Sequence, residues 1–120
     1  MITDSSFGVD SDNVVISGKM SEASRYIHSQ NLKTITIDST MGEVSVYLDG
    51  AKAAGDEVIM NVNTSMCDVN VYIPSDWQVE NNMQNSLSDV DIDHSKGTGT
   101  KLILQGRNTM GDLTVKHVKD

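Results

Sequence analysis

The sequence repeats a four-residue pattern five times, and this repeat constrains the fold more than any other feature. The pattern is Met or Leu, then a small residue, an acidic residue and an apolar residue. Successive copies begin 21, 25, 21 and 23 residues apart, at Met20, Met41, Met66, Leu87 and Met110. Units of this length cannot bury an apolar face alone, so they stack and bury it against their neighbours. We expect one repeat domain that covers residues 1–120.

Apolar residues alternate with polar ones on both sides of each repeat anchor, which is typical of a strand with one buried face. Around Met41 they are Ile35 and Ile37 before the anchor, and Val44 and Val46 after it. The step from Ile37 to Met41 is even and the step from Met41 to Val44 is odd, so the chain must turn a corner to keep all of them inside. A small residue at the corner fits a tight bend or bulge. Those residues are Ser21, Gly42, Cys67, Ser88 and Gly111.

The repeat therefore predicts an all-β fold, a short parallel β-solenoid of about five coils of 21–25 residues. Consecutive coils are expected to lie side by side, with their parallel strands about 4.8 Å apart. A sandwich of hairpins is the alternative, because strands separated by turn signals also suit that architecture.

Composition excludes several classes of function. The chain has 17 acidic and 9 basic residues, a formal charge of -8, and its basic residues are scattered, so we expect no nucleic-acid partner. No apolar run is long enough for a membrane helix and the first ten residues do not resemble a signal peptide, so we expect a soluble chain without membrane contact of its own. A single cysteine, Cys67, excludes an internal disulfide and is expected to pack as a small residue.

Catalytic motifs are missing from the sequence. It contains no nucleophile elbow, phosphate-binding loop or zinc-binding helix motif. We therefore expect a protein that is not an enzyme and needs no cofactor.

The acidic residue of each repeat should stack into a ladder. The five positions are Glu22, Glu43, Asp68, Asp89 and Asp112. Like charges at that spacing repel by about 1 kcal/mol per pair in a water-like dielectric, so something should offset the repulsion. Calcium could do so with carboxylate ligands, whereas backbone N–H groups of the corners could do so by hydrogen bonding. The glycine-spaced aspartate loops of calcium-binding repeats are absent, which favours the hydrogen bonds.

Two histidines stand at one repeat position. His94 and His117 each follow their anchor by seven residues, where earlier coils have Ile27, Leu48 and Ile73. Adjacent coils would bring the imidazoles together, and with Asp93 they could bind a transition metal. The alternative is two neutral histidines at the end of a strand.

Three tyrosines stand six residues after their anchors, on the face opposite the buried valines: Tyr26, Tyr47 and Tyr72. A stacked ladder of this kind can support strand pairing alone, or it can form an aromatic surface that binds a partner. Trp77, after Pro74, is expected to pack on the next coil.

Three segments resemble, in order, the C-terminal domain of LiaF-type cell-wall-active antibiotic response proteins. They are "STMGEVSVYLDGA", "VNVYIPSDWQV" and "TKLILQGRNTMGDLTVK", and the resemblance extends from Val14 to Val118. Its most specific parts are "YIPSDWQV" and "LILQG". Met or Leu stands where that family usually has Phe.

The resemblance implies a non-enzymatic regulatory domain at the bacterial cell envelope. Members of that family typically carry membrane helices before this domain and modulate the sensor histidine kinase of a two-component system. A protein partner of that kind is therefore expected. Because the ends of a solenoid expose strand edges, the strand from Leu113 to Val118 could also pair with a second chain to form a homodimer. The second interpretation is a structural or surface module that binds a cation or glycan through the acidic ladder.

Overall fold

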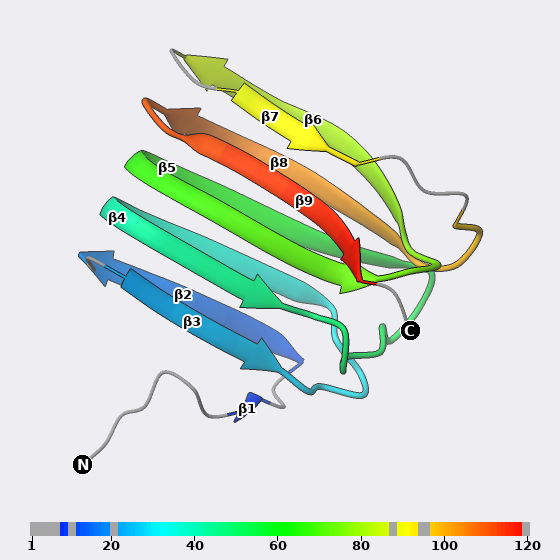
Figure 1. Ribbon diagram of the computed structural model, residues 1–120. Coiled ribbons are helices and arrows are strands. Elements are labelled where there is room, and N and C mark those ends of the chain that lie inside the picture. The colour runs from blue at the N-terminus through cyan, green and yellow to red at the C-terminus, as the bar shows by residue number, and fades with distance from the viewer. Residues whose placement is uncertain (1–7, 10–11, 20–21, 87–88, 94–96, 119–120) are drawn as a thin grey trace.

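The computed structural model describes residues 8–9, 12–19, 22–86, 89–93 and 97–118. Over these residues the chain is all-β, without a helix, and its nine strands form one sheet in which all the pairings are parallel (Figure 1). The all-β prediction is therefore confirmed. The alternative of stacked hairpins is wrong, because a hairpin pairs its strands antiparallel.

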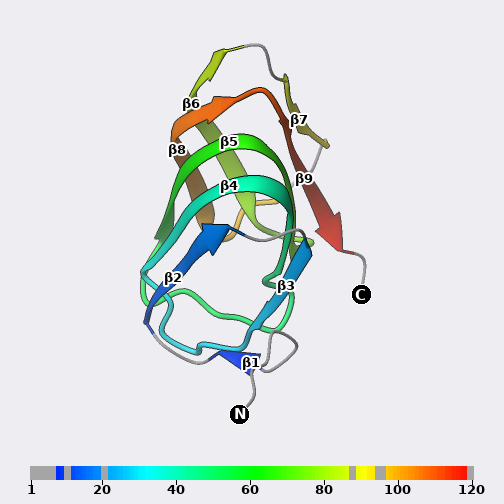
Figure 2. The ribbon, with the colours of Figure 1, turned by 90° about the vertical axis from the view of Figure 1, so that its left-hand side faces the viewer.

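The strands divide into five repeat units, each bent over a corner (Figure 2). The first unit is β2 (Asn13–Lys19) with β3 (Glu22–Ile27), the second is β4 (Thr34–Tyr47) and the third is β5 (Glu57–Pro74). The fourth is β6 (Gln78–Ser86) with β7 (Asp89–Ile92), and the fifth is β8 (Lys101–Thr109) with β9 (Asp112–Val118). A two-residue strand, β1 (Gly8–Val9), pairs with β3. The bent sheet does not close on itself, since its two end units are not paired to each other.

The units are not stacked in the order of the sequence. The third unit pairs with the fifth, through β5–β8 and β5–β9, and the fifth pairs with the fourth, through β6–β8 and β7–β9. The expected stacking of consecutive coils is thus wrong at one step. The expectation that Leu113 to Val118 is an edge strand is wrong for Leu113 to Val115, because this part of β9 lies between β5 and β7.

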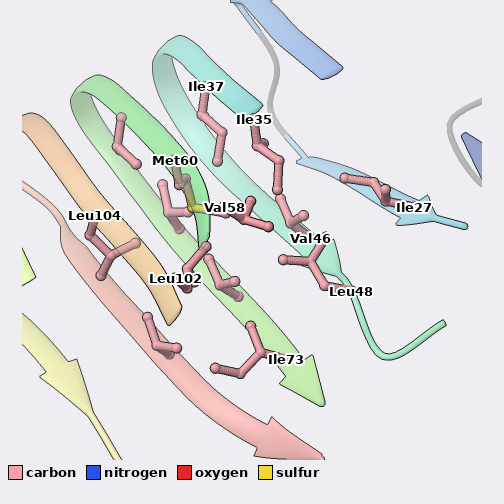
Figure 3. Close-up of a cluster of buried hydrophobic side chains, with 14 of the residues drawn as sticks. Ile27, Ile35, Ile37, Val46, Leu48, Val58, Met60, Ile73, Leu102 and Leu104 are labelled. Carbon is pink, nitrogen blue, oxygen red and sulfur yellow. The ribbon is translucent and has the colours of Figure 1, made fainter. Parts of the chain in front are cut away.

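The core lies inside the bend and is formed by the alternating apolar residues of both halves of each unit (Figure 3). Ile35, Met60 and Leu104 form one buried row across β4, β5 and β8. Val46, Val71 and Val115 form another across β4, β5 and β9. These residues are those that the alternation places inside. In the fourth unit the inward positions are only half-buried: Val79, Met83, Val90 and Ile92.

The corners differ from the prediction. The anchors Met41, Met66 and Met110 are exposed, at 57%, 49% and 52%, whereas the repeat predicts them inside. Each adopts a left-handed backbone conformation, with φ of 65°, 56° and 56°, and this conformation turns the side chain out of the alternation. Met20 and Leu87, the other two anchors, lie outside the described residues, as do the corner residues Ser21 and Ser88.

At the fifth corner, the residue after the anchor is small for a steric reason. A Cβ atom added at Gly111 would lie 2.1 Å from the carbonyl oxygen of Cys67 in the neighbouring strand. Cys67 itself is a free, buried thiol, and burial raises its pKa. It packs in the core, as expected. Beside it, the Thr64 hydroxyl donates to Asn108 Oδ1 (2.8 Å), and Asn108 Nδ2 donates to the Gly111 carbonyl (2.9 Å).

Candidate binding face

The second half of each unit presents a polar outer face. Because Val44 and Val46 point inward in β4, the intervening Glu43, Ser45 and Tyr47 point outward. Parallel pairing repeats this arrangement in register on the neighbouring strands. We call the outer surface that carries the acidic residues Glu22, Glu43, Asp68 and Asp112 and the tyrosines Tyr26, Tyr47 and Tyr72 the tyrosine–acid face.

The three tyrosines form a stacked ladder across β3, β4 and β5. The ring centroids of Tyr26 and Tyr47 are 4.5 Å apart and those of Tyr47 and Tyr72 are 4.7 Å apart, with interplanar angles of 6° and 9°. These separations match the spacing of neighbouring strands, about 4.8 Å. The sequence-based prediction of a stacked tyrosine ladder is confirmed. Lys116 of β9 takes the next place in the row after Tyr72.

The stacking affects the central tyrosine. The pKa of Tyr47 is raised, first by burial, then by the neighbouring phenols of Tyr26 and Tyr72 and by the carboxylate of Glu43. Its ring faces are covered by the two other rings. Tyr47 therefore presents its ring edge and hydroxyl group to a partner, rather than an open ring face on which a sugar would stack.

The acidic residues also lie in one row. Glu22 pairs with Glu43, Glu43 with Asp68, and Asp89 with Asp112. Two contacts offset their repulsion: Asn70 Nδ2 donates to Glu43 Oε2 (2.9 Å), and the Asp112 N–H donates to Asp68 Oδ1 (3.0 Å). The second is a carboxylate–backbone bond, but its N–H belongs to the neighbouring unit, whereas the N–H groups of the carboxylate's own corner were expected. Among the described residues, no group of three or more His, Cys, Asp or Glu side chains is arranged to hold a metal ion.

The exposed methionines border this face at the corner. Met41, Met66 and Met110 lie at equivalent positions of the second, third and fifth units, each two residues before an acidic residue. We call these three side chains the methionine ridge. The sequence repeat predicts that these methionines occupy equivalent positions, but it does not predict that they are exposed. Three large apolar side chains at a solvated corner are a common feature of protein-binding surfaces.

His117 is at the expected repeat position but has different partners. It takes the place in β9 that Ile73 has in β5, and its ring contacts the Asp93 carboxylate through Nδ1. Its Nε2 lies 2.8 Å from the carbonyl oxygen of Trp77, and its backbone N–H donates to Asp93 Oδ2 (2.9 Å). His94, the other proposed metal ligand, lies outside the described residues. Trp77 is buried in the core cluster, in line with the packing role expected of it.

These contacts hold the end of the fourth unit on the fifth. Burial alone would raise the pKa of Asp93, but hydrogen bonds from the His117 backbone and ring, and the charges of His117 and Lys116, lower it. Asp93 follows β7 directly, and its own N–H donates to the Val115 carbonyl (3.1 Å). Asp93 and His117 thus form a structural link between β7 and β9.

Comparison with known proteins yields no match to this chain, whether with protein-family models, curated proteins or solved structures. Over the described residues, the structure contains no helix that could cross a membrane.

Proposed function

We propose that this chain is a non-enzymatic protein-binding module that docks its partner through the tyrosine–acid face and the methionine ridge. The observation that carries the proposal is the register of these groups. Each of β4 and β5 presents an exposed Met, an acidic residue and a stacked Tyr at equivalent positions on one side of the bent sheet. Interfaces concentrate binding energy in a few aromatic or apolar anchors surrounded by polar contacts.

The specific form of the proposal follows the sequence resemblance. We propose that the five units are a short parallel β-solenoid, open along one side, with its fourth and fifth coils exchanged. The partner proposed is the sensor histidine kinase of a bacterial cell-envelope stress response. A chain with a net charge of -8 and acidic residues on its binding face favours a partner segment with basic residues.

The second candidate is a surface module that binds a cation or glycan through the acidic row. The register of the acidic residues favours it. The bonds that Glu43 and Asp68 already accept, and the covered ring faces of Tyr47, weigh against it.

The test uses the double variant Tyr47→Ser with Tyr72→Ser. A pull-down measures how much of the histidine kinase from the same operon this variant captures. We expect capture to fall by about tenfold or more, since truncating two anchors costs about 1–2 kcal/mol each. The melting temperature should change by only a few degrees, because the rings lie outside the core.

The matched control is Glu43→Gln together with Asp68→Asn, which removes charge and keeps side-chain size. Loss of capture in this pair alone would show an electrostatic contact that weakens with salt, and the tyrosines would then only support strand pairing. Full capture by both double variants would contradict docking on this face.

A further inference from the structure

The fourth unit forms an open end of the sheet. Among the described residues, β6 pairs only with β8, and β7 pairs only with β9, so the outer edge of both strands has no partner (Figures 1 and 2). Such an edge presents a row of N–H and C=O groups that can pair with another strand. The apolar residues behind it, Val90 and Ile92, pack against the core but remain half-exposed. One further strand would cover them.

The charged residues along this edge are all acidic. In β7 the acidic Asp89 and Asp91 point outward and are exposed, while Val90 and Ile92 point inward. Neither β6 nor β7 contains a lysine, arginine or histidine. A strand that paired here would therefore place its inward residues on an apolar surface and its outward residues beside carboxylates.

A second copy of this chain does not fit the edge by two-fold pairing. If β7 paired antiparallel with β7 of another copy, each register that kept Val90 and Ile92 inward and placed a residue of β7 on the two-fold axis would set at least one aspartate opposite another. Like charges directly opposite each other destabilise a strand pair.

A second copy does not fit head to tail either. Continuing the parallel register would place the first unit of the next copy on the fourth unit of this one, with Glu22 beside Asp89 and Arg25 beside Ile92. The first contact brings two negative charges together. The contact of Arg25 with Ile92 would place a charged side chain against an apolar one. Inward-pointing charges of this kind prevent edge-to-edge association of natural sheets.

We propose that the edge of β7 binds an extended segment of another protein in which basic and apolar residues alternate. Lysine or arginine would lie beside Asp89 and Asp91, and apolar residues would cover Val90 and Ile92. Backbone hydrogen bonds would supply affinity and the alternate side chains specificity, as in other cases of β-strand addition. This site differs from the tyrosine–acid face in using a backbone edge at one end of the stack, where Asp89 is the last member of the acidic row, beside Asp112.

The test is binding of a fluorescent seven-residue peptide that alternates lysine and valine, followed by fluorescence anisotropy. A peptide of the same composition with its lysines grouped at one end should bind at least about tenfold more weakly. Methylation of alternate backbone nitrogens of the alternating peptide should also abolish binding, because it removes N–H donors and keeps the charge. Hydrogen exchange of the β7 amides should slow when the first peptide binds.

Charge reversal in the protein provides the second arm. The double variant Asp89→Lys with Asp91→Lys should bind the alternating lysine peptide about tenfold or more weakly than the parent chain does. It should also bind a peptide that alternates glutamate and valine. The matched control, Asp38→Lys with Asp49→Lys, makes the same charge change at exposed sites away from this edge and should leave both results as in the parent chain.

Three results would overturn the proposal. Equal binding of the alternating and grouped peptides would mean that only net charge is recognised. An unchanged affinity in the Asp89 and Asp91 double variant would place the peptide elsewhere. A dimer of the parent chain in sedimentation, with protected β7 amides, would mean that a second copy occupies the edge.

Discussion

Val71 and Ile92 occupy the same inward row of the sheet, one in its middle and the other at its end. The row continues from Arg25 through Val46, Val71 and Val115 to Ile92. Its three central members are fully buried, whereas Arg25 and Ile92 are half-buried. At one end of the row stands the charged Arg25, whose Nη1 donates a hydrogen bond to the Ser24 carbonyl oxygen (3.2 Å). Thus a position in the repeat fixes the direction of a side chain, and the place of the unit in the stack fixes its burial.

The largest expected effect tests this comparison directly. Val71→Asp should unfold the domain, since it buries an unpaired carboxylate at a cost of about 4 kcal/mol or more. Ile92→Asp, in the same row, should cost only about 1 kcal/mol, because water reaches the side chain. Urea denaturation of both variants measures the difference. Asn70→Ser, on the outward face next to Val71, is the control and should cost only about 1 kcal/mol or less, because it removes a single partly exposed hydrogen bond, the one to Glu43. Equal losses at Val71 and Ile92 would show that the end unit is as buried as the middle.

A smaller effect concerns the attachment of the end unit. The lowered pKa of Asp93 means that its ionised form stabilises the fold, so this contribution is present above a pH of about 4 and is lost as the pH falls below it. Asp93→Asn should remove that pH dependence and loosen β7 at neutral pH. Hydrogen exchange of the amides in β7 and in β5, followed between pH 3 and 7, measures how firmly β7 is attached. The amides of β5 should stay protected, and parallel loss of protection in both strands would contradict a local role.

The smallest expected effect is that of a glycine substitution at a corner, which is compared with the same substitution in a strand. Met66 has a φ of 56°, and a non-glycine residue in this region costs about 1 kcal/mol or more. Met66→Gly should therefore raise the melting temperature by about 2 °C, after the greater entropy of glycine in the unfolded chain is subtracted. Met83→Gly, in the extended backbone of β6, should lower it. If Met66→Gly were clearly destabilising, the methionine would contribute contacts that its exposure does not reveal.

The sequence predicts most of the strand structure because alternation is a local signal. Ile35, Val46 and Val71 are buried as the period-two pattern requires, and Tyr47 stacks with its neighbours because equal spacing from the anchor brings equal register. The exposure of Met66 could not be predicted in this way. An apolar residue is assigned to the core by composition, whereas here the backbone conformation of the corner sets its direction.

The order of the units is not encoded in this pattern. Any two units can pair in the same register, so the local sequence does not distinguish a fourth unit beside the third from a fifth unit beside it. One residue did carry a signal: Asn81 stands in β6 where Ile35, Met60 and Leu104 are buried, and a polar residue there suits an end unit. The contact of His117 with the Trp77 carbonyl joins segments 40 residues apart and depends on that order.

The insertion of β8 and β9 between β5 and the fourth unit has a consequence for how the chain reaches its native state. During synthesis the fourth unit emerges before the fifth, and at that moment the free edge of β5 is the surface it meets. Both β6 and β5 pair with β8 in matching register, so β6 can pair with β5 as an interim partner. The native arrangement then requires this pairing to break before the fifth unit can enter. Folding of this small domain is therefore expected to include a kinetic trap formed by correct strands with the wrong neighbour.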